Sequence, residues 1–156
     1  FKEWADAYGV VYPLQTFTKG MDYEHLKVPV CLEDNCLSRH AETVRKLAEC
    51  LSPDVRNIDE QQRGIIHLAA VFACNFSNAM YQISDDILKN HNLDFDILKP
   101  LMQTSLNKLD TMSPAQAQTG PAKRGDVSVM NKHLDMLTTD KQKEIYRLIS
   151  NFIVNK

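Results

Sequence analysis

Apolar and polar positions separate clearly along one long stretch without proline, Asp59 to Leu88. At about 100° per residue, one side of a helix here would be apolar throughout, with Leu68, Phe72, Phe76, Ala79, Met80, Ile83 and Ile87. The opposite side would carry Arg63, His67, Cys74, Asn78, Tyr81 and Asp85, with Asn75 and Gln82 on its flank. This mixture of cation, imidazole, carboxamide and phenol is not that of an ordinary solvated helix face. The pattern therefore predicts a central helix that packs its apolar side in a core and turns its polar side to a site.

Upstream of this helix the pattern changes to short apolar runs rich in β-branched residues. Three runs predict strands: residues 9–17, 28–33 and 54–59. Apolar residues from Ser38 to Leu51 recur at helical spacing, and Pro53 ends that helix. A strand, a helix and a strand in this order are typical of a parallel sheet. Because three strands are too few for a covered doubly wound sheet, we interpret this section as the closing part of one.

Downstream of the central helix, apolar spacing predicts three further helices. We expect caps at Asp94 and Asp126 for the first two, and a Thr139–Gln142 capping box for the last. Pro100 would kink the first of them or mark its first turn. The expected inner faces of the last two helices are Val129, Met130, His133, Leu134 and Leu137, and then Ile145, Leu148, Ile149 and Phe152. Residues 113–125 form a break rich in small and polar residues. Because helices make up most of the predicted elements, the chain should be mainly α.

Composition narrows the function. A chain of 156 residues can bury a core of its own, and a net charge of −2 gives no broad footprint for nucleic acid or a membrane surface. No run reaches the roughly 18 apolar residues of a membrane-spanning helix, and no secretory signal opens the chain. We therefore expect a cytoplasmic protein that binds neither nucleic acid nor membrane. Because the chain opens with Phe1 and enters a helix-like fragment at once, we also expect it to begin part-way through a domain.

The four cysteines predict no metal site. They include no Cys-x-x-Cys pair, which favours reduced thiols: Cys31, Cys36, Cys50 and Cys74. A hydrolase that used Cys74 and His67 is disfavoured, because the two are seven residues apart, nearly two turns of one helix.

His67 is the first candidate for chemistry. It follows Arg63 by one turn, so a substrate carboxylate or phosphate could bridge the two, with the guanidinium as a bidentate anchor. An imidazole can donate or accept a proton near neutral pH, as the reduction of a carbonyl or imine requires. Spacing alone favours the alternative, a structural histidine bonded to a carbonyl in the core. Asn75 and Asn78 either orient a ligand or bridge helices.

Two loops are further candidates. The break Gln118-Thr119-Gly120-Pro121, followed by Arg124, would present backbone N–H groups and a hydroxyl to an anion or a carboxamide. It is also a common helix connector. The second loop, with Pro13, Gln15 and Thr16, leaves the end of the first strand, where open α/β sheets bind ligands, although a plain crossover loop has the same pattern. The five glycines form neither G-x-G-x-x-G nor a P-loop, so these residues contain no glycine-rich turn that binds the phosphates of a dinucleotide.

Three separated stretches carry a family resemblance: YPLQTF at 12–17, IDEQQR with HLAAVFACNF within 58–76, and AQTGPAKRGD at 117–126. They closely resemble a family of NAD(P)-dependent oxidoreductases of unassigned substrate, similar to pyrroline-5-carboxylate reductase and the 6-phosphogluconate dehydrogenase superfamily. The resemblance covers nearly the whole chain. It implies that residues 1–58 are the last strands and helix of a Rossmann-like α/β domain. Residues 59–156 would then be an all-helical dimerisation and substrate domain.

The resemblance also implies roles for the candidate residues. The resemblance places Pro13, Gln15 and Thr16 near the nicotinamide of NADP or NAD. Along the cleft from the central helix it places Arg63, His67 and Asn75, with His67 as proton donor. From the helix break, across a homodimer, it places Gln118, Thr119 and Gly120. The hydroxyacid-dehydrogenase branch has Lys, and Asn one turn later, where this chain has Arg63 and His67, which argues against that chemistry.

Two hypotheses about function follow from the sequence. The parent protein is an NAD(P)-dependent reductase or dehydrogenase of a small carbonyl or imine substrate, or the chain is a non-catalytic helical homodimerisation or ligand-binding module. About 100 upstream residues containing a strand and then G-x-G-x-x-G would favour the enzyme.

Overall fold

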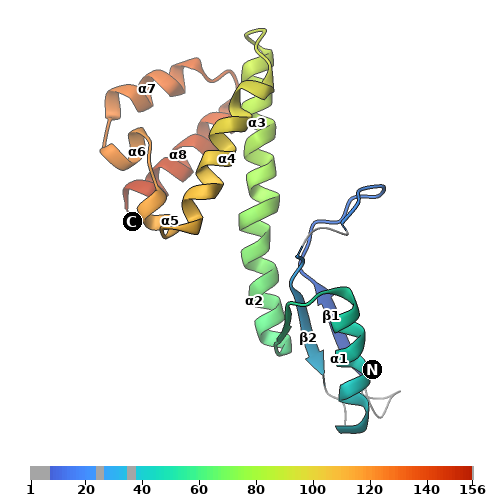
Figure 1. The fold of residues 1–156 in the computed structure, drawn as a ribbon. Helices are drawn as coiled ribbons and strands as arrows, with labels where there is room; N and C mark the ends of the chain where they lie inside the picture. Colours follow the sequence, from blue (N-terminus) through green and yellow to red (C-terminus); the bar gives the residue numbers. More distant parts are fainter. Residues whose placement is uncertain (1–7, 24–26, 35–37, 156) are drawn as a thin grey trace. The chain divides into compact units, whose positions relative to one another are not determined.

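The computed structural model describes residues 8–23, 27–34 and 38–155 (Figure 1). It divides into two compact units, Phe1–Asn78 and Ala79–Lys156, each of which is described by itself. This division falls inside the central helical stretch, whereas the sequence analysis placed a domain boundary ahead of Asp59. The helix-like fragment expected at the start and Cys36 lie outside the described residues. Among those described, helices predominate beside a three-stranded sheet, which confirms a mainly α fold with an α/β element. None of the described helices is long and apolar enough to cross a membrane.

A mixed sheet forms the base of the first unit. Its strands lie in the order β1 (Gly9–Pro13), β2 (Val30–Asp34) and β3 (Val55–Asn57). β3 runs parallel to β2, and α1 (Ser38–Leu51) connects them, as the strand–helix–strand pattern predicts. β1 is antiparallel to β2, and the described residues of the connection between them, 14–23 and 27–29, contain no helix such as a parallel crossover needs.

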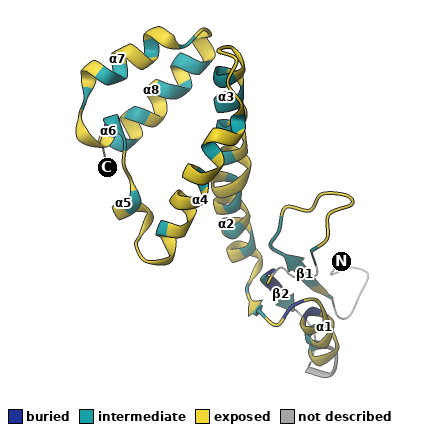
Figure 2. Ribbon diagram, turned by 45° about the horizontal axis from the view of Figure 1, so that its top comes forward, coloured by how far each residue is buried: buried dark blue, intermediate teal, exposed yellow. Residues whose placement is uncertain are grey.

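The middle strand carries the core of this unit (Figure 2). Four residues of β2 and α1 are at most 2% exposed: Val30, Cys31, Leu32 and Ala48. α1 packs so closely on β1 that a Cβ added to Gly9 would lie 3.1 Å from Val44 Cγ1. Burial raises the pKa of the Cys31 thiol, while the Arg56 charge opposes this rise and Asp54 adds to it. This cysteine therefore stays an uncharged part of the core.

The central helical stretch is built from three consecutive segments. They are α2 (Glu60–Ala70), a π-helical segment (Val71–Phe76) and α3 (Ser77–Lys89). The Asp59 carboxylate accepts the Gln62 N–H at 2.7 Å, and the Gln62 side-chain oxygen accepts the Asp59 N–H at 2.9 Å, which confirms the predicted capping box. The π segment was not predicted, since the spacing analysis assumed one regular α-helix.

The apolar side of this stretch is largely exposed, so the prediction that it packs in a core within this chain is wrong for its first half. Leu68 is 58% exposed, Phe72 64% and Phe76 49%. The rings of Phe72 and Phe76 contact each other edge to face, with centroids 4.9 Å apart. Amphipathic spacing indicates that a helix face requires cover, but it does not say which molecule provides the cover.

The second unit is helical throughout its described residues. After α3 come a 3-10 turn (Phe95–Leu98), α4 (Lys99–Asn107), a second 3-10 turn (Lys108–Asp110), α5 (Pro114–Ala117), α6 (Pro121–Arg124), α7 (Val127–Met136) and α8 (Asp140–Val154). Pro100 lies in the first turn of α4, one of the two predicted places. The expected break at 113–125 therefore contains two short helices.

The predicted caps of this unit are confirmed in part. The Asp126 carboxylate accepts the Val129 N–H at 3.1 Å. The Thr139 hydroxyl accepts the Gln142 N–H at 3.2 Å, without the reciprocal bond of a full capping box among the described hydrogen bonds. Asp94 makes no side-chain cap bond, because the chain enters a 3-10 turn there and not an α-helix.

The predicted inner face of α8 is only partly covered. Ile145 is half-buried, but Leu148 and Phe152 are 63% and 64% exposed. Ala122 of α6 is the buried apolar residue among those described in this unit, at 7% exposure. The second unit thus also presents a large apolar surface.

Candidate functional site

A cavity of about 370 Å³ in the first unit collects several of the residues that the sequence singles out. β1 and the loop after it contribute Tyr12, Leu14, Gln15, Thr16 and Phe17, while α2 and the π segment contribute His67, Ala70, Val71, Cys74 and Asn75. Its size and its mixed polar and apolar lining are typical of small-molecule sites. The strand end and the helix therefore meet at a place where a ligand of modest size can bind.

Tyr12 and His67 face each other in this cavity. The Tyr12 Oη atom lies 3.1 Å from His67 Nδ1, and the two rings meet edge to face with centroids 6.4 Å apart. Nε2 of His67 has no hydrogen-bond partner among the described residues. The alternative of a histidine bonded to a carbonyl in the core does not fit this geometry, since His67 is exposed and its partner is a side-chain hydroxyl.

The π segment decides which asparagine reaches the cavity. In a regular α-helix, eight residues at about 100° each would place Asn75 about 80° away from His67. Each residue of a wider π turn advances by less than this angle, which brings Asn75 back towards the line of His67. Asn75 accordingly lines the cavity, and Asn78 does not. Regular spacing had placed them the other way round, with Asn78 on the polar line and Asn75 on its flank.

The loop after β1 is fixed by its own hydrogen bonds. The Gln15 side-chain oxygen accepts the Thr16 backbone N–H at 2.8 Å and the Thr16 hydroxyl at 3.3 Å. Tyr23 donates its hydroxyl to the Thr16 carbonyl at 3.1 Å, and its ring meets Phe17 edge to face. The hydrogen bonds described for the Gln15 side chain use its oxygen, and Gln15 is one of the residues that line the cavity. Pro13, the third predicted residue of this loop, is not among the residues that line it.

Arg63 is paired within the protein. Its Nη2 atom lies 3.2 Å from Glu33 Oε2 on β2, and the two side chains are only 30% and 12% exposed. The angle is not that of a hydrogen bond, since buried Glu33 Oε2 and Arg63 Nε have no hydrogen-bond partner among the described residues. Arg63 does not line the cavity. The guanidinium that was predicted to anchor a substrate thus holds a carboxylate of the sheet.

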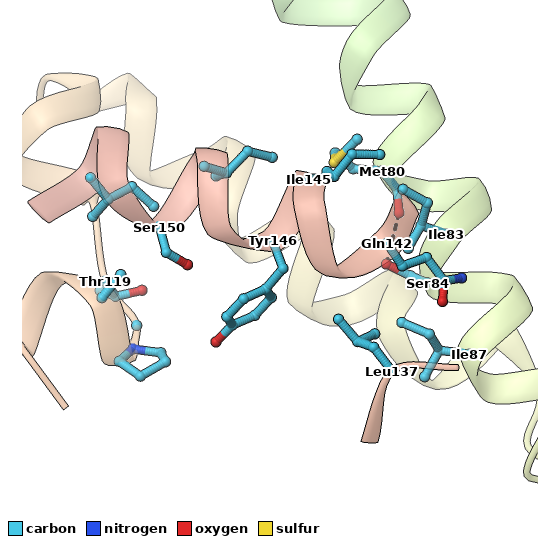
Figure 3. Close-up of a pocket in the computed structure, with 15 residues that line it drawn as sticks. Met80, Ile83, Ser84, Ile87, Thr119, Leu137, Gln142, Ile145, Tyr146 and Ser150 are labelled. Atoms are coloured by element: carbon cyan, nitrogen blue, oxygen red, sulfur yellow. Dashed lines mark hydrogen bonds between the residues drawn. The ribbon is translucent and has the colours of Figure 1, made fainter. Parts of the chain in front are cut away.

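The remaining predicted residues lie in the second unit. Thr119 and Gly120 border a cavity of about 320 Å³ lined mostly by apolar side chains of α3 and α8 (Figure 3). Gln118 lines a smaller one of about 130 Å³, and Arg124 is exposed at the end of α6. We assign no chemistry to these residues.

The cavity beside His67 offers acid–base chemistry and hydrogen bonding. The residues that line it carry an imidazole, two carboxamides, two hydroxyls and a thiol, together with apolar side chains. Among the described residues, no group of three or more His, Cys, Asp or Glu side chains could hold a metal ion. One imidazole facing a cavity can transfer one proton, which is what the reduction of a polar double bond needs beside a hydride.

Sequence reasoning missed Tyr12. The residue lies in an apolar run that reads as a buried strand, and its partner is 55 positions away. Its phenol, directly ahead of the loop, was the one feature that could have identified Tyr12 as a residue of the site.

The ion pair of Arg63 with Glu33 should stabilise the first unit. Removing one partner leaves the other partner largely buried and unpaired, so Glu33→Gln and Arg63→Gln should each lower the free energy of unfolding by about 1–3 kcal/mol. The double variant should cost less than the sum. Urea unfolding of the four proteins measures this coupling, and the exposed Arg56–Asp54 pair, at 2.8 Å, is the matched control with an expected coupling below about 1 kcal/mol. If the losses of unfolding free energy in the two single variants add up in the double variant, Arg63 does not depend on Glu33 and is free for another role.

Comparisons with known proteins agree with this fold. The chain matches the crystal structure of the "putative NADP oxidoreductase BF3122" from Bacteroides fragilis at 38% identity and a TM-score of 0.92, over 98% of its own length. It matches protein TM1727 from Thermotoga maritima at 26% identity and a TM-score of 0.71, over 93% of its length. The chain spans 59% of each of these proteins. No curated protein matches it.

A family model is the remaining comparison. The model described as a domain of unknown function, DUF2520, matches residues 28–153, which include α1, the sheet strands β2 and β3 and every described helix that follows. The chain therefore belongs to the DUF2520 family.

Proposed function

We propose that the natural protein is an NAD(P)-dependent oxidoreductase that reduces, or in the reverse direction forms, the C=O or C=N bond of a small substrate. The observation that carries this proposal is His67, which lines a cavity between a strand end and a helix and whose Nε2 has no hydrogen-bond partner within the described part of the chain. The match over nearly the whole chain to the protein named "putative NADP oxidoreductase BF3122" supports it.

The chain's own residues fit one end of such a cofactor. The Gln15 amide and the Thr16 hydroxyl border the cavity and complement a carboxamide such as that of nicotinamide. A phosphate-gripping glycine turn is not present in this sequence, so we propose that it lies in the part of the natural protein outside these 156 residues. Residues 1–58 would then close a Rossmann-like domain. The hydride would come from the dihydronicotinamide of such a cofactor, and the choice between NADP and NAD would lie in that other part.

Two polar side chains at the cavity take part in the proposed reaction. His67 supplies the proton that the substrate oxygen or nitrogen takes up when its carbon receives the hydride. The Asn75 carboxamide orients the substrate by hydrogen bonds. We assign Arg63 to Glu33 and not to the substrate, because the two already form an ion pair.

We also propose that the natural protein is a homodimer. Leu68, Phe72 and Phe76 form an exposed apolar patch on the central stretch, and soluble monomers rarely expose large contiguous patches of this kind. The alternative function, a non-catalytic dimerisation module, would use the same patch but would not need His67.

The mutation of His67 to Asn tests the enzyme. In the full natural protein, His67→Asn should lower turnover of small α-keto acids, aldehydes or cyclic imines by about 10²–10⁴-fold, because a positioned acid contributes roughly that factor. NADPH affinity, measured by fluorescence titration, should change less than about twofold, since Asn preserves polarity. His91→Asn is the control, because His91 lies outside the cavity and contacts the Ile87 carbonyl. The proposal would be contradicted if the protein bound no NADPH and no NADH at high micromolar concentration. Full activity of the His67 variant would also contradict it.

Substitution of the exposed patch tests the dimer. Light scattering should give the natural protein twice the mass of its chain, and Phe72→Lys should shift the population towards one chain. Leu47→Lys on α1 introduces the same charge at a residue of similar exposure, 57%, and should leave the mass unchanged. A mass of one chain for the unsubstituted protein at micromolar concentration would contradict the proposed homodimer.

A further inference from the structure

We infer that Tyr12 is a positioning residue for His67: its hydroxyl holds Nδ1–H, so that Nε2 is the nitrogen that exchanges a proton at the cavity. The 3.1 Å contact between Tyr12 Oη and His67 Nδ1 carries this inference, together with the absence of a partner for Nε2 among the described residues. The inference rests on the proposed function, in which His67 supplies a proton, and it names the group that determines which nitrogen does so.

A hydroxyl suits this task because its oxygen can accept a hydrogen bond in both protonation states of the imidazole. When the imidazole is protonated, Nδ1–H donates to Oη and Nε2–H faces the cavity. When Nε2 has given its proton to the substrate, Nδ1–H still donates to Oη, so the neutral ring keeps its hydrogen on Nδ1. In the reverse direction, the free Nε2 lone pair takes up the proton that the substrate loses. The proton is therefore exchanged at Nε2 alone.

The surrounding structure fixes both rings. Tyr12 lies in β1, where it pairs with Cys31 of the buried strand β2, so its backbone cannot shift easily. One turn before His67, Arg63 is held by Glu33 of the same strand β2. The helix is therefore attached to the sheet at two points one turn apart. The edge-to-face ring contact, at an interplanar angle of 64°, adds an apolar restraint on the imidazole.

The second unit supplies an internal control. Tyr146 of α8 and His133 of α7 form the same kind of pair, with Oη 2.9 Å from Nδ1 and the rings edge to face at 5.8 Å. This pair lies in the other compact unit. Removing its hydroxyl should affect the imidazole of His133 alone.

The experiment combines nitrogen spectra with kinetics on the full natural protein carrying ¹⁵N-labelled histidine. At about pH 8.5, where imidazole is neutral, unsubstituted His67 should show the Nδ1–H tautomer, with Nδ1 as a hydrogen-bond donor and Nε2 without a hydrogen. In Tyr12→Phe the Nδ1 resonance should move towards the average of two tautomers, and kcat should fall about tenfold, with KM changed less than about twofold. Tyr146→Phe should shift the His133 resonances and leave those of His67 in place. The His67→Asn spectrum assigns the signals.

Each contrary result has a distinct meaning. A neutral His67 that holds its hydrogen on Nε2 in the unsubstituted protein overturns the inference without any variant, so a Tyr12→Phe protein that fails to fold does not protect it. Unchanged His67 nitrogen resonances in a folded Tyr12→Phe protein, or unchanged kcat where His67→Asn is inactive, also overturn the role of Tyr12 alone. Turnover that survives His67→Asn removes the proposed function, and the role of Tyr12 with it.

Discussion

The hydrogen bond between Tyr12 and His67 joins the first strand to the central helix, and the candidate site depends on it. It sets the imidazole against the loop that carries Gln15 and Thr16. The ion pair of Arg63 with Glu33 attaches the same helix to the next strand. Because the two contacts lie one helical turn apart, the start of the helix has a defined rotation about its axis. That rotation determines which later residues border the cavity.

Local signals account for what the sequence predicted well. The Ser38–Leu51 helix and the Asp59–Gln62 capping box depend on residues within a few positions of one another, so spacing and residue type are sufficient to find them. His67, Gln15 and Thr16 were identified individually from their chemistry, and the structure places them around one cavity. Their roles in a reaction stay predictions.

The features that the sequence did not reveal depend on contacts between distant segments or on a small change in helix geometry. Glu33 precedes Arg63 by thirty positions, so helical spacing offered only a substrate as a partner for the guanidinium. Tyr12 was hidden within an apolar strand. The π segment carries no proline or glycine to mark it, yet it exchanges the places of Asn75 and Asn78 relative to the cavity. Amphipathic spacing likewise indicated that Phe72 requires cover without showing what covers it.

The most direct measurement of the central claim is a crystal structure of the full natural protein with NADP. We expect the nicotinamide ring to bind between the Gln15–Thr16 loop and His67, with Nε2 directed at the open face of the ring where a substrate would bind. A nicotinamide ring bound elsewhere, with the cavity beside His67 closed by protein side chains, would contradict it.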